Sequence, residues 1–287
     1  MENRFTDRVE AVNDEIDTVA SEITPEPLSD AVRHISLSGG KRLRPILTTV
    51  ACEAVGGDPL DSDAVRHATA VELVHTSALV ADDIIDRSEI RRGVSSVHEK
   101  YGHPMAVLSS NVLIGEAFDL IESSEAAEVM TDALVRLGEG EALELTEGLE
   151  TVDDYFDLAY KKTGSLFLAA CKLGAVSGDA SQEEIRSVGE YGRNMGIAFQ
   201  IRDDILDFTS NPGDLGKPVG EDALMERPSL VVIHSKANDV TVEESIGFAR
   251  ERAMSYVEDA RSSLDTLDED ATESLEEIAD FVVERTK

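Results

Sequence analysis

The chain has 287 residues and no Pro/Gly/Ser-rich linker, so we expect a single domain over residues 1–287. Its 59 acidic residues against 26 basic ones give a formal net charge of −33, which argues against nucleic acid and anionic membranes as partners and suggests a halophile's cytosol. The N-terminus lacks the apolar core of a signal peptide and no run of 18 apolar residues occurs, so we expect a soluble, cytoplasmic protein without stable membrane insertion.

The segment GGKRLRP at residues 39–45 concentrates basic side chains in a chain that has few of them. Its glycines leave backbone amides accessible, and its Lys and Arg side chains can neutralise an anion, which suits a diphosphate. A helix start with surface salt bridges accounts for the segment about equally well. Residues 39–45 are therefore a candidate anion site that needs support from the rest of the chain.

Helical periodicity dominates the chain. Apolar residues recur at three- and four-residue steps in four segments, at 65–81, 106–121, 154–177 and 190–208. The first and last of these are apolar on more than one face, as expected of central helices in a thick bundle. Residues 181–184 and 241–244 fit capping boxes at the starts of later helices. No segment shows sustained strand alternation, so we expect an all-α fold.

Two copies of an acidic motif close apolar helical segments, DDIID at Asp82–Asp86 and DDILD at Asp203–Asp207. The first and last Asp of each copy are four residues apart, so a helix places both carboxylates on one face. Such a pair suits hard, oxygen-preferring cations, and Mg²⁺ is the natural candidate. Like charges beside apolar surface are costly unless cations or basic groups compensate them, so we prefer this interpretation to a solvated acidic face.

A third copy, DDYFD at Asp153–Asp157, follows a polar stretch. Its acidic residues are typical of a helix start, where the helix dipole favours negative charge. We interpret this copy as structural.

Further basic or polar residues lie near these motifs. Arg91-Arg92-Gly93 follows the first aspartate motif and would bring two guanidinium groups beside it. Lys161-Lys162-Thr163 and Gly216-Lys217 are candidates for binding an anion, or ion-pair partners in an acidic protein. His75 lies one to two turns before the first motif, and by itself a core histidine is the simpler interpretation. No HExxH, CxxC, GxSxG, GxGxxG or P-loop pattern is present, which disfavours zinc hydrolases, serine hydrolases, dinucleotide enzymes and NTPases.

Four motifs of different chemistry follow one another along the chain: GGKRLRP, ELVHTSALVADDIIDRSEIRRG, YKKTGSLF and GIAFQIRDDILDF. In this order and spacing they strongly resemble the trans-prenyl diphosphate synthases, also called polyprenyl synthetases, from about residue 30 to 235. The third acidic copy falls where the family has none. Acidity and lipid chemistry together suggest a haloarchaeal member, similar to the geranylgeranyl diphosphate synthases, that makes isoprenoid lipid precursors.

The resemblance implies an all-α, single-domain helical bundle around a deep central cavity, with the two aspartate motifs facing each other across its mouth. It implies a Mg²⁺-dependent transferase that condenses isopentenyl diphosphate with an allylic prenyl diphosphate. It also implies a homodimer. Metal and cations would stabilise the departing pyrophosphate, and the double bond of isopentenyl diphosphate would attack the allylic cation. Proton loss would follow, with the released pyrophosphate as the base.

The resemblance also assigns site residues, position by position. The metal ligands are matched by Asp82, Asp86 and Asp203, whereas Asp83 and Asp207 match the motif with less certain roles. The residues that hold isopentenyl diphosphate are matched by Lys41, Arg44, His75 and Arg92. Those that hold the allylic diphosphate are matched by Arg91, Lys162 and Lys217. Thr163 and Gln200 match polar groups near the reacting carbon, so the catalytic set is Lys162, Thr163 and Gln200.

Three positions depart from the commoner family pattern. The Gly-Asp after the first aspartate motif is Ser110-Asn111 here, the Gln before the Lys-Thr motif is Glu141, and the Lys-x-Thr after the second motif begins at Arg227. Arg227 keeps the charge but offers a planar fork instead of a point donor. These changes concern the surroundings of the catalytic residues more than the residues themselves.

Other functions share some of these sequence features. A class I terpene cyclase or head-to-head synthase also binds diphosphate through Mg²⁺, but cyclases commonly steer cations with aromatic walls, and this chain has no Trp and 5% aromatic residues. A non-catalytic partner subunit of a hetero-oligomeric synthase is the alternative from another class. Such subunits often lack one aspartate motif, and this chain has both. A helical acidic protein that buffers cations would not need the basic motifs.

Product length is the least constrained property. Ser77 and Ala78 lie one turn before Asp82, about 6–8 Å along the helix at 1.5 Å per residue, and both are small. In the resembled family an aromatic residue there can close the tunnel early, so their size argues against a product limited to C15. We favour a C20 product, with C25 or longer as the main alternative. Phe118 is a possible floor of the tunnel, although a core position is the simpler interpretation.

Overall fold

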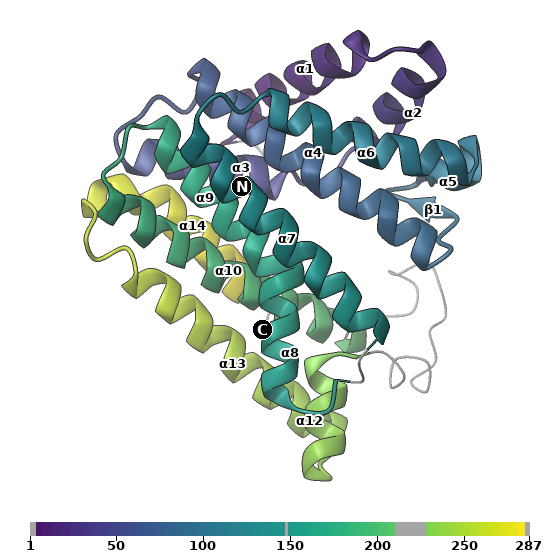
Figure 1. Cartoon of the computed structure of the whole chain (residues 1–287). Helices are drawn as coiled ribbons and strands as arrows, with labels where there is room; N and C mark the ends of the chain where they lie inside the picture. Colours follow the sequence, from purple (N-terminus) through teal and green to yellow (C-terminus); the bar gives the residue numbers. More distant parts are fainter. Residues whose placement is uncertain (1–3, 147–148, 210–227, 285–287) are drawn as a thin grey trace. The chain divides into compact units, whose positions relative to one another are not determined.

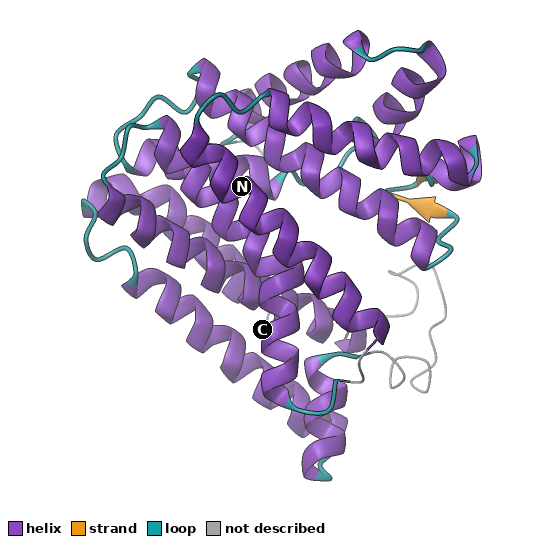
Figure 2. Cartoon of the chain, viewed as in Figure 1, coloured by secondary structure: helices purple, strands orange, loops and turns teal. Residues whose placement is uncertain are grey.

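The structure is a computed structural model, and it describes residues 4–146, 149–209 and 228–284. In these ranges the regular structure is helical except for a short hairpin, in which β1 (Ile90–Arg91) pairs antiparallel with β2 (Val94–Ser95) (Figure 2). The expected all-α fold is confirmed.

The chain forms two compact units. The first comprises residues 1–130 with 170–185, and the second comprises 131–169 with 186–287. Three helices contribute residues to both units: α7 (Ser124–Thr146), α9 (Ser165–Ser177) and α10 (Gln182–Thr209).

The first unit is built around α4 (Ser62–Ile85). Its other helices are α1 (Thr6–Glu22), α2 (Glu26–Ser36), α3 (Leu43–Ala54), α5 (Val97–Tyr101) and α6 (His103–Asp119). α4 packs against α1, α3 and α6, and it runs alongside α6 (Figure 1). Residues on several faces of α4 are buried, from Ala64 to Asp83, which confirms the central position expected from its apolar sequence.

The ends of α4 are defined by aspartates. Asp61 is the N-cap, and its side chain accepts a hydrogen bond from the backbone N–H of Asp63 at 3.0 Å. At the other end, Asp86 is the C-cap. The predicted segment 65–81 lies inside this helix, and the first aspartate motif occupies its last turn.

The second unit contains α8 (Val152–Ala159), a short π-helix η1 (Tyr160–Gly164), α12 (Leu230–Asn238), α13 (Val242–Ser262) and α14 (Glu269–Glu284). Its core joins Tyr155 of α8 and Ile201 of α10 to Leu230 of α12 and Ala253 of α13, all nearly inaccessible to water. α10 also approaches η1 closely at Gly196. A Cβ atom at this position would lie 2.6 Å from the Cα of Gly164, so only glycine leaves room for the contact.

The predicted helix starts are confirmed. At Thr241 the side chain and Glu244 form both halves of a capping box, and Ser181 exchanges the same pair of bonds with Glu184. The third acidic copy begins α8, where Thr151 is the N-cap and Asp154 completes a capping box. Its interpretation as a helix start is therefore confirmed.

Candidate active site

The aspartates of the first motif lie in two different environments at the end of α4. Asp82 and Asp86 are joined by a helical hydrogen bond, from the N–H of Asp86 to the carbonyl of Asp82 at 2.8 Å, so their carboxylates belong to one helix face. Asp83 is buried instead, and its Oδ1 accepts hydrogen bonds from Nε of Arg91 at 2.8 Å and from Nη2 at 2.5 Å. The Asp83 carboxylate therefore fixes Arg91 beside the motif.

The hairpin that follows α4 presents the next arginine. Its two turn residues, Arg92 and Gly93, both have positive φ, 52° and 79°, which is typical of the tight turns that match strand twist. Positive φ is unfavourable for Arg, but two hydrogen bonds hold the Arg92 side chain: Nη1 donates to the carbonyl of Gly39 at 2.8 Å and Nη2 donates to Glu72 Oε1 at 3.3 Å. The hairpin is thereby tied to the glycine loop before α3.

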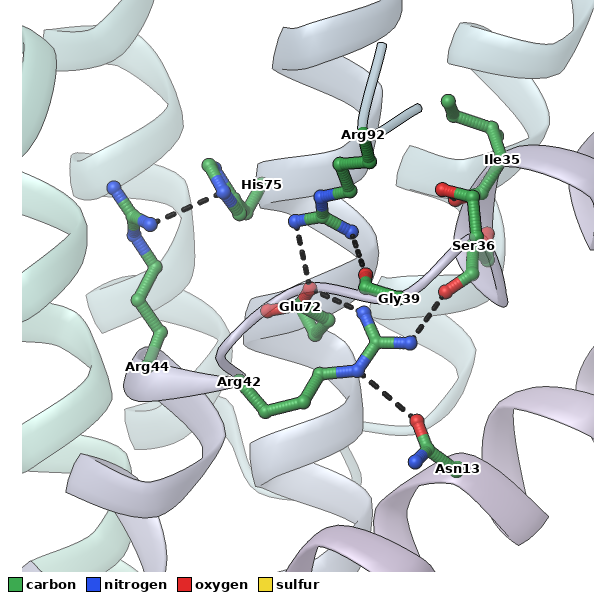
Figure 3. Close-up of polar contacts among 10 residues, drawn as sticks. Asn13, Ile35, Ser36, Gly39, Arg42, Arg44, Glu72, His75 and Arg92 are labelled. Carbon is green, nitrogen blue, oxygen red and sulfur yellow. Dashed lines mark hydrogen bonds and ion pairs between the residues drawn. The ribbon is translucent and has the colours of Figure 1, made fainter. Parts of the chain in front are cut away.

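The basic segment forms a loop and the first turn of α3 (Figure 3). Lys41 is exposed on this loop, whereas Arg42 is buried beneath it. Nη1 of Arg44 donates a hydrogen bond to Nε2 of His75 at 3.1 Å, because Arg can only donate. The predicted residues Lys41, Arg44, His75 and Arg92 therefore come from one loop, α3, α4 and the hairpin of the same unit.

Positive charge is concentrated around His75. Desolvation lowers its pKa well below the ordinary value, and the guanidinium groups of Arg44, Arg92, Arg42 and Arg91 lower it further. The carboxylates of Glu72 and Asp83 offset part of this charge, but the four guanidinium groups keep a net positive charge in a chain of net charge −33, which suits a polyanion. Arg42 was not among the predicted site residues.

In the second unit, the Lys-Thr motif lies in η1. A π-helical turn is an uncommon structure that often occurs at functional sites, and this one contains Lys161, Lys162 and Thr163. The ammonium group of Lys162 contacts Glu141 Oε1 at 3.0 Å and also pairs with Glu144. The departure at Glu141 thus places a carboxylate directly against a residue predicted to hold diphosphate.

A chain of hydrogen bonds connects η1 with α10 and α12. Thr163 Oγ1 donates to Gln200 Oε1 at 2.8 Å, and Gln200 Nε2 donates to Asp204 Oδ1 at 3.1 Å. The second oxygen of Asp204 accepts from the N–H of Leu230 at 2.9 Å, at the start of α12. Burial raises the pKa of Asp204 to about 6 despite these bonds. Asp204 therefore orients Gln200, which in turn orients Thr163.

Asp203 of the second aspartate motif is partly exposed. Its Oδ1 accepts from Nε of Arg202 at 3.2 Å and from Nη2 at 2.6 Å. The Arg202 guanidinium also lies 3.9 Å from the ring centroid of Phe199, so it is held in a fixed place. Asp207 lies one turn further along α10.

The donor set fits a hard divalent cation. Asp82 and Asp86 would offer two carboxylates on one helix face, and Mg²⁺ is usually held by one or two carboxylates together with diphosphate oxygens and water. In the part of the chain that the structure describes, no cluster of three or more His, Cys, Asp or Glu side chains is arranged to hold a metal.

Some predicted residues cannot be placed. Lys217 and Arg227 lie outside the described residues. Sequence reasoning also missed three residues that hold the others in place: Arg42, Glu72 and Asp204. The signal for Glu72 was present, because it is an acidic residue inside the apolar segment AVELV.

A cavity of about 510 Å³ in the first unit contains none of the predicted residues. His67 and four acidic side chains line it, those of Asp63, Glu122, Glu125 and Asp179. Its acidic lining is unsuited to a diphosphate.

The chain is similar to known proteins along most of its length. The family model for polyprenyl synthetases matches residues 25–264. A short chain isoprenyl diphosphate synthase of Methanothermobacter thermautotrophicus is 40% identical, with 96% of each chain covered. A geranylfarnesyl diphosphate synthase of Aeropyrum pernix is 36% identical over 92% of this chain and 96% of that one.

The chain is also similar in fold to solved structures. The geranylgeranyl pyrophosphate synthetase of Pyrococcus horikoshii Ot3 has a TM-score of 0.88 at 35% identity, covering 98% of this chain and 97% of that one. A polyprenyl synthase of Caulobacter crescentus CB15, complexed with calcium and isoprenyl diphosphate, has a TM-score of 0.87 at 28% identity, covering 100% and 97%.

The chain belongs to the polyprenyl synthetase family. It is a chain-elongating prenyltransferase with the helical fold of isoprenoid synthases. No helix among its described residues is long and apolar enough to cross a membrane.

Proposed function

We propose that the protein condenses isopentenyl diphosphate with an allylic prenyl diphosphate, in the presence of Mg²⁺, to give geranylgeranyl diphosphate. The observation that carries the proposal is a basic site in an otherwise acidic protein: Arg44 is bonded to His75, and Arg92 packs against the glycine loop that carries Lys41. A diphosphate needs such a cluster, whereas a protein that only buffers cations does not.

Within this cluster, Lys41, Arg44, His75 and Arg92 hold isopentenyl diphosphate. His75 takes part as a neutral imidazole, because its Nε2 accepts from Arg44 and leaves Nδ1–H free to donate. Arg91 is held by Asp83 at the aspartate motif and serves the allylic diphosphate, together with Lys162 and Lys217. The two substrates thus use different sets of cations.

Asp82, Asp86 and Asp203 would hold Mg²⁺, which when bound would supply positive charge to stabilise the departing pyrophosphate. Arg91 and Lys162 add hydrogen bonds to the same leaving group. Thr163 and Gln200, aligned by Asp204, present oxygen atoms toward the allylic carbon, where positive charge develops. These oxygens are already positioned before reaction, which is the preorganisation that lowers barriers most effectively.

The bond changes follow from this arrangement. The allylic C–O bond breaks, and its electron pair leaves with pyrophosphate. The double bond of isopentenyl diphosphate then forms the new C–C bond, and a proton leaves the adjacent carbon to restore a double bond. Pyrophosphate accepts this proton, so no side-chain base is required. Holding the two substrates in one site replaces an improbable encounter in solution.

Product length is C20 in this proposal. Ala78 is small and only partly buried, so α4 presents no aromatic barrier one turn before Asp82. A C25 product is the second candidate, because similar proteins include both geranylgeranyl and geranylfarnesyl synthases. We propose further that the whole chain acts as one catalytic domain, works as a homodimer, and functions in the cytoplasm of a salt-adapted cell.

Turnover by the purified protein tests the reaction. Isopentenyl diphosphate would be supplied with Mg²⁺ in molar KCl and with dimethylallyl, geranyl or farnesyl diphosphate, one at a time. We expect chromatography of the dephosphorylated products to show geranylgeraniol. Absence of elongation with every primer would favour a non-catalytic subunit and would contradict the proposal.

Substrate titrations test the assignment of the two cation sets. Lys41→Ala and Arg92→Ala should raise KM for isopentenyl diphosphate more than KM for the allylic substrate, and Lys162→Ala should do the reverse. One charge-assisted contact corresponds to roughly a ten- to hundredfold effect. Equal losses for both substrates in all three variants would contradict the assignment.

A further inference from the structure

A buried carboxylate lies in the middle of α4. Glu72 is 2% exposed and follows Val71 in an apolar stretch of the helix. An ionised carboxylate is costly to bury unless hydrogen-bonded cations compensate it. Here Oε1 accepts from two guanidinium groups, from Arg42 Nη1 at 2.6 Å and from Arg92 Nη2 at 3.3 Å (Figure 3).

The Arg42 side chain is buried, and its hydrogen bonds go to the protein interior. Arg42 is the N-cap of α3 with φ 48°, and its side chain is 3% exposed. Besides its bond to Glu72, Nη2 donates to the carbonyl of Ser36 at 2.6 Å and Nε donates to Asn13 Oδ1 at 3.0 Å. Each nitrogen of the guanidinium therefore has a protein acceptor. Although Arg42 belongs to the basic segment, its place is beneath the anion site.

Arg92 lies between Glu72 and the glycine loop. Nη1 donates to the carbonyl of Gly39, and a Cβ at Gly40 would lie 2.9 Å from the Arg92 Cζ. The guanidinium thus packs directly against Gly40, where any larger residue would displace it. Two guanidinium groups share one carboxylate, so the cluster keeps one net positive charge for an anion.

We propose that Arg42 and Glu72 are positioning residues for the isopentenyl diphosphate site. Arg42 fixes the Glu72 carboxylate, and Glu72 fixes the Arg92 guanidinium against the loop that carries Lys41. This inference rests on the proposed function, in which Arg92 and Lys41 hold that diphosphate. Neither Arg42 nor Glu72 touches substrate.

The chemistry of the pair favours this role over simple stabilisation. A buried ion pair adds little stability compared with apolar residues of similar size. The planar guanidinium of Arg42, however, donates hydrogen bonds to residues of α1, α2 and α4 at once. The point charge of a Lys ammonium group could not do this. Without Glu72, Arg92 must be ordered at the moment of binding, which corresponds to about a three- to tenfold loss of affinity.

The test separates positioning from stability. The double variant Arg42→Met/Glu72→Met replaces the buried pair with apolar side chains, which proteins often tolerate. We expect its melting temperature to stay near that of the wild type. KM for isopentenyl diphosphate should rise about three- to tenfold, and KM for the allylic substrate and kcat should change less than about twofold. Calorimetric titration with isopentenyl diphosphate alone should show the same loss of affinity.

A matched control and a conservative variant sharpen the result. Arg8→Met/Glu53→Met removes another ion pair between α1 and α3, at 2.7 Å, and should leave both KM values unchanged. Arg42→Lys keeps the charge but loses the fork, so its KM for isopentenyl diphosphate should lie between those of the wild type and the double variant.

The outcomes are distinguishable. If the wild type neither binds nor uses isopentenyl diphosphate, the proposed function fails. If the wild type is active and the folded double variant has an unchanged KM for isopentenyl diphosphate, the positioning role is wrong. Should the double variant not fold, Asn13→Ala removes a single anchor of Arg42. A selective rise of about twofold in the same KM would support the inference, and no rise would overturn it.

Discussion

The guanidinium of Arg44 donates its Nη1–H to Nε2 of His75 across 3.1 Å, which fixes His75 as a neutral imidazole protonated on Nδ1. Desolvation holds the pKa of His75 below its ordinary value, and so do the guanidinium groups of Arg44, Arg92, Arg42 and Arg91. His75 therefore resembles an amide in its hydrogen bonding, with one acceptor and one donor.

His75 should make the protein less stable in mild acid. Its folded pKa is depressed, so below the unfolded pKa of about 6.5 the unfolded chain binds a proton that the folded protein does not. Stability is consequently lost as pH falls from about 6.5 toward the folded pKa. Between pH 7 and 5.5, the free energy of unfolding of His75→Gln, which keeps an acceptor for Arg44, should fall less than that of the wild type. Parallel pH dependences in denaturant melts of the two proteins would contradict this.

The aspartate motifs should differ sharply in their contributions to activity. Asp82→Ala or Asp203→Ala removes an oxygen ligand from the proposed cation site, so kcat/KM should fall at least about a hundredfold. Asp153→Ala in the third copy is the matched control, because that residue lies exposed at the start of α8. Its activity should remain within about twofold of the wild type. Near wild-type turnover of Asp82→Ala at saturating Mg²⁺ would rule out the metal role.

Glu141 should weaken the binding of the allylic substrate. Its carboxylate lies 3.0 Å from the Lys162 ammonium, so a diphosphate must compete for that cation. Glu141→Gln removes the competing charge, and KM for the allylic substrate should fall by up to about fivefold, the usual range of a partly exposed ion pair. Glu139 pairs with Arg136 at 3.0 Å, so Glu139→Gln is the control. It should change KM for the allylic substrate less than Glu141→Gln does. A higher KM in Glu141→Gln would mean that Glu141 orients Lys162 productively.

The net charge of −33 predicts dependence on salt. Transfer from molar KCl to dilute buffer lengthens the Debye screening distance from about 3 Å to about 30 Å, so the acidic surface repels itself. The melting temperature and activity should fall together. Sucrose in place of KCl provides the control, because it has no charge and should restore less of the stability. A melting temperature independent of KCl would contradict the adaptation to salt but leave the chemistry unaffected.

Local sequence patterns were sufficient to predict the helices and to identify the acidic, basic and polar side chains of the candidate site. The i, i+4 spacing of Asp82 and Asp86, and the periodicity of α4 and α10, depend on neighbours within two turns. The partners that set the role of a side chain were not local. Arg42 reaches Glu72 across 30 positions and Thr163 reaches Gln200 across 37, so no sequence window contains both. The π-helical turn at Lys162 has no sequence signature of its own.

The structure changes which residue best tests product length. Ser77 is 3% exposed, and its Oγ donates to the Ser110 carbonyl at 3.0 Å, so it faces α6 and a Phe there would overpack the α4–α6 contact. Ala78 is only partly buried and lies four residues before Asp82, on the same face and about 6 Å below it. A prenyl chain extending from a diphosphate held at Asp82 should pass Ala78.

Ala78→Phe should therefore shift the products from C20 toward C15 or shorter, with little loss of stability, because its side chain enters the path of the chain. Ser77→Phe should instead lower stability by about 1–3 kcal/mol. Ala78→Ser is the control for substitution at this position and should leave the C20 product unchanged. Chromatography of dephosphorylated products, together with thermal melts, checks both effects. An unchanged product length for Ala78→Phe would show that the chain runs along another face of α4, and a C15 product from the wild type would refute the open path altogether.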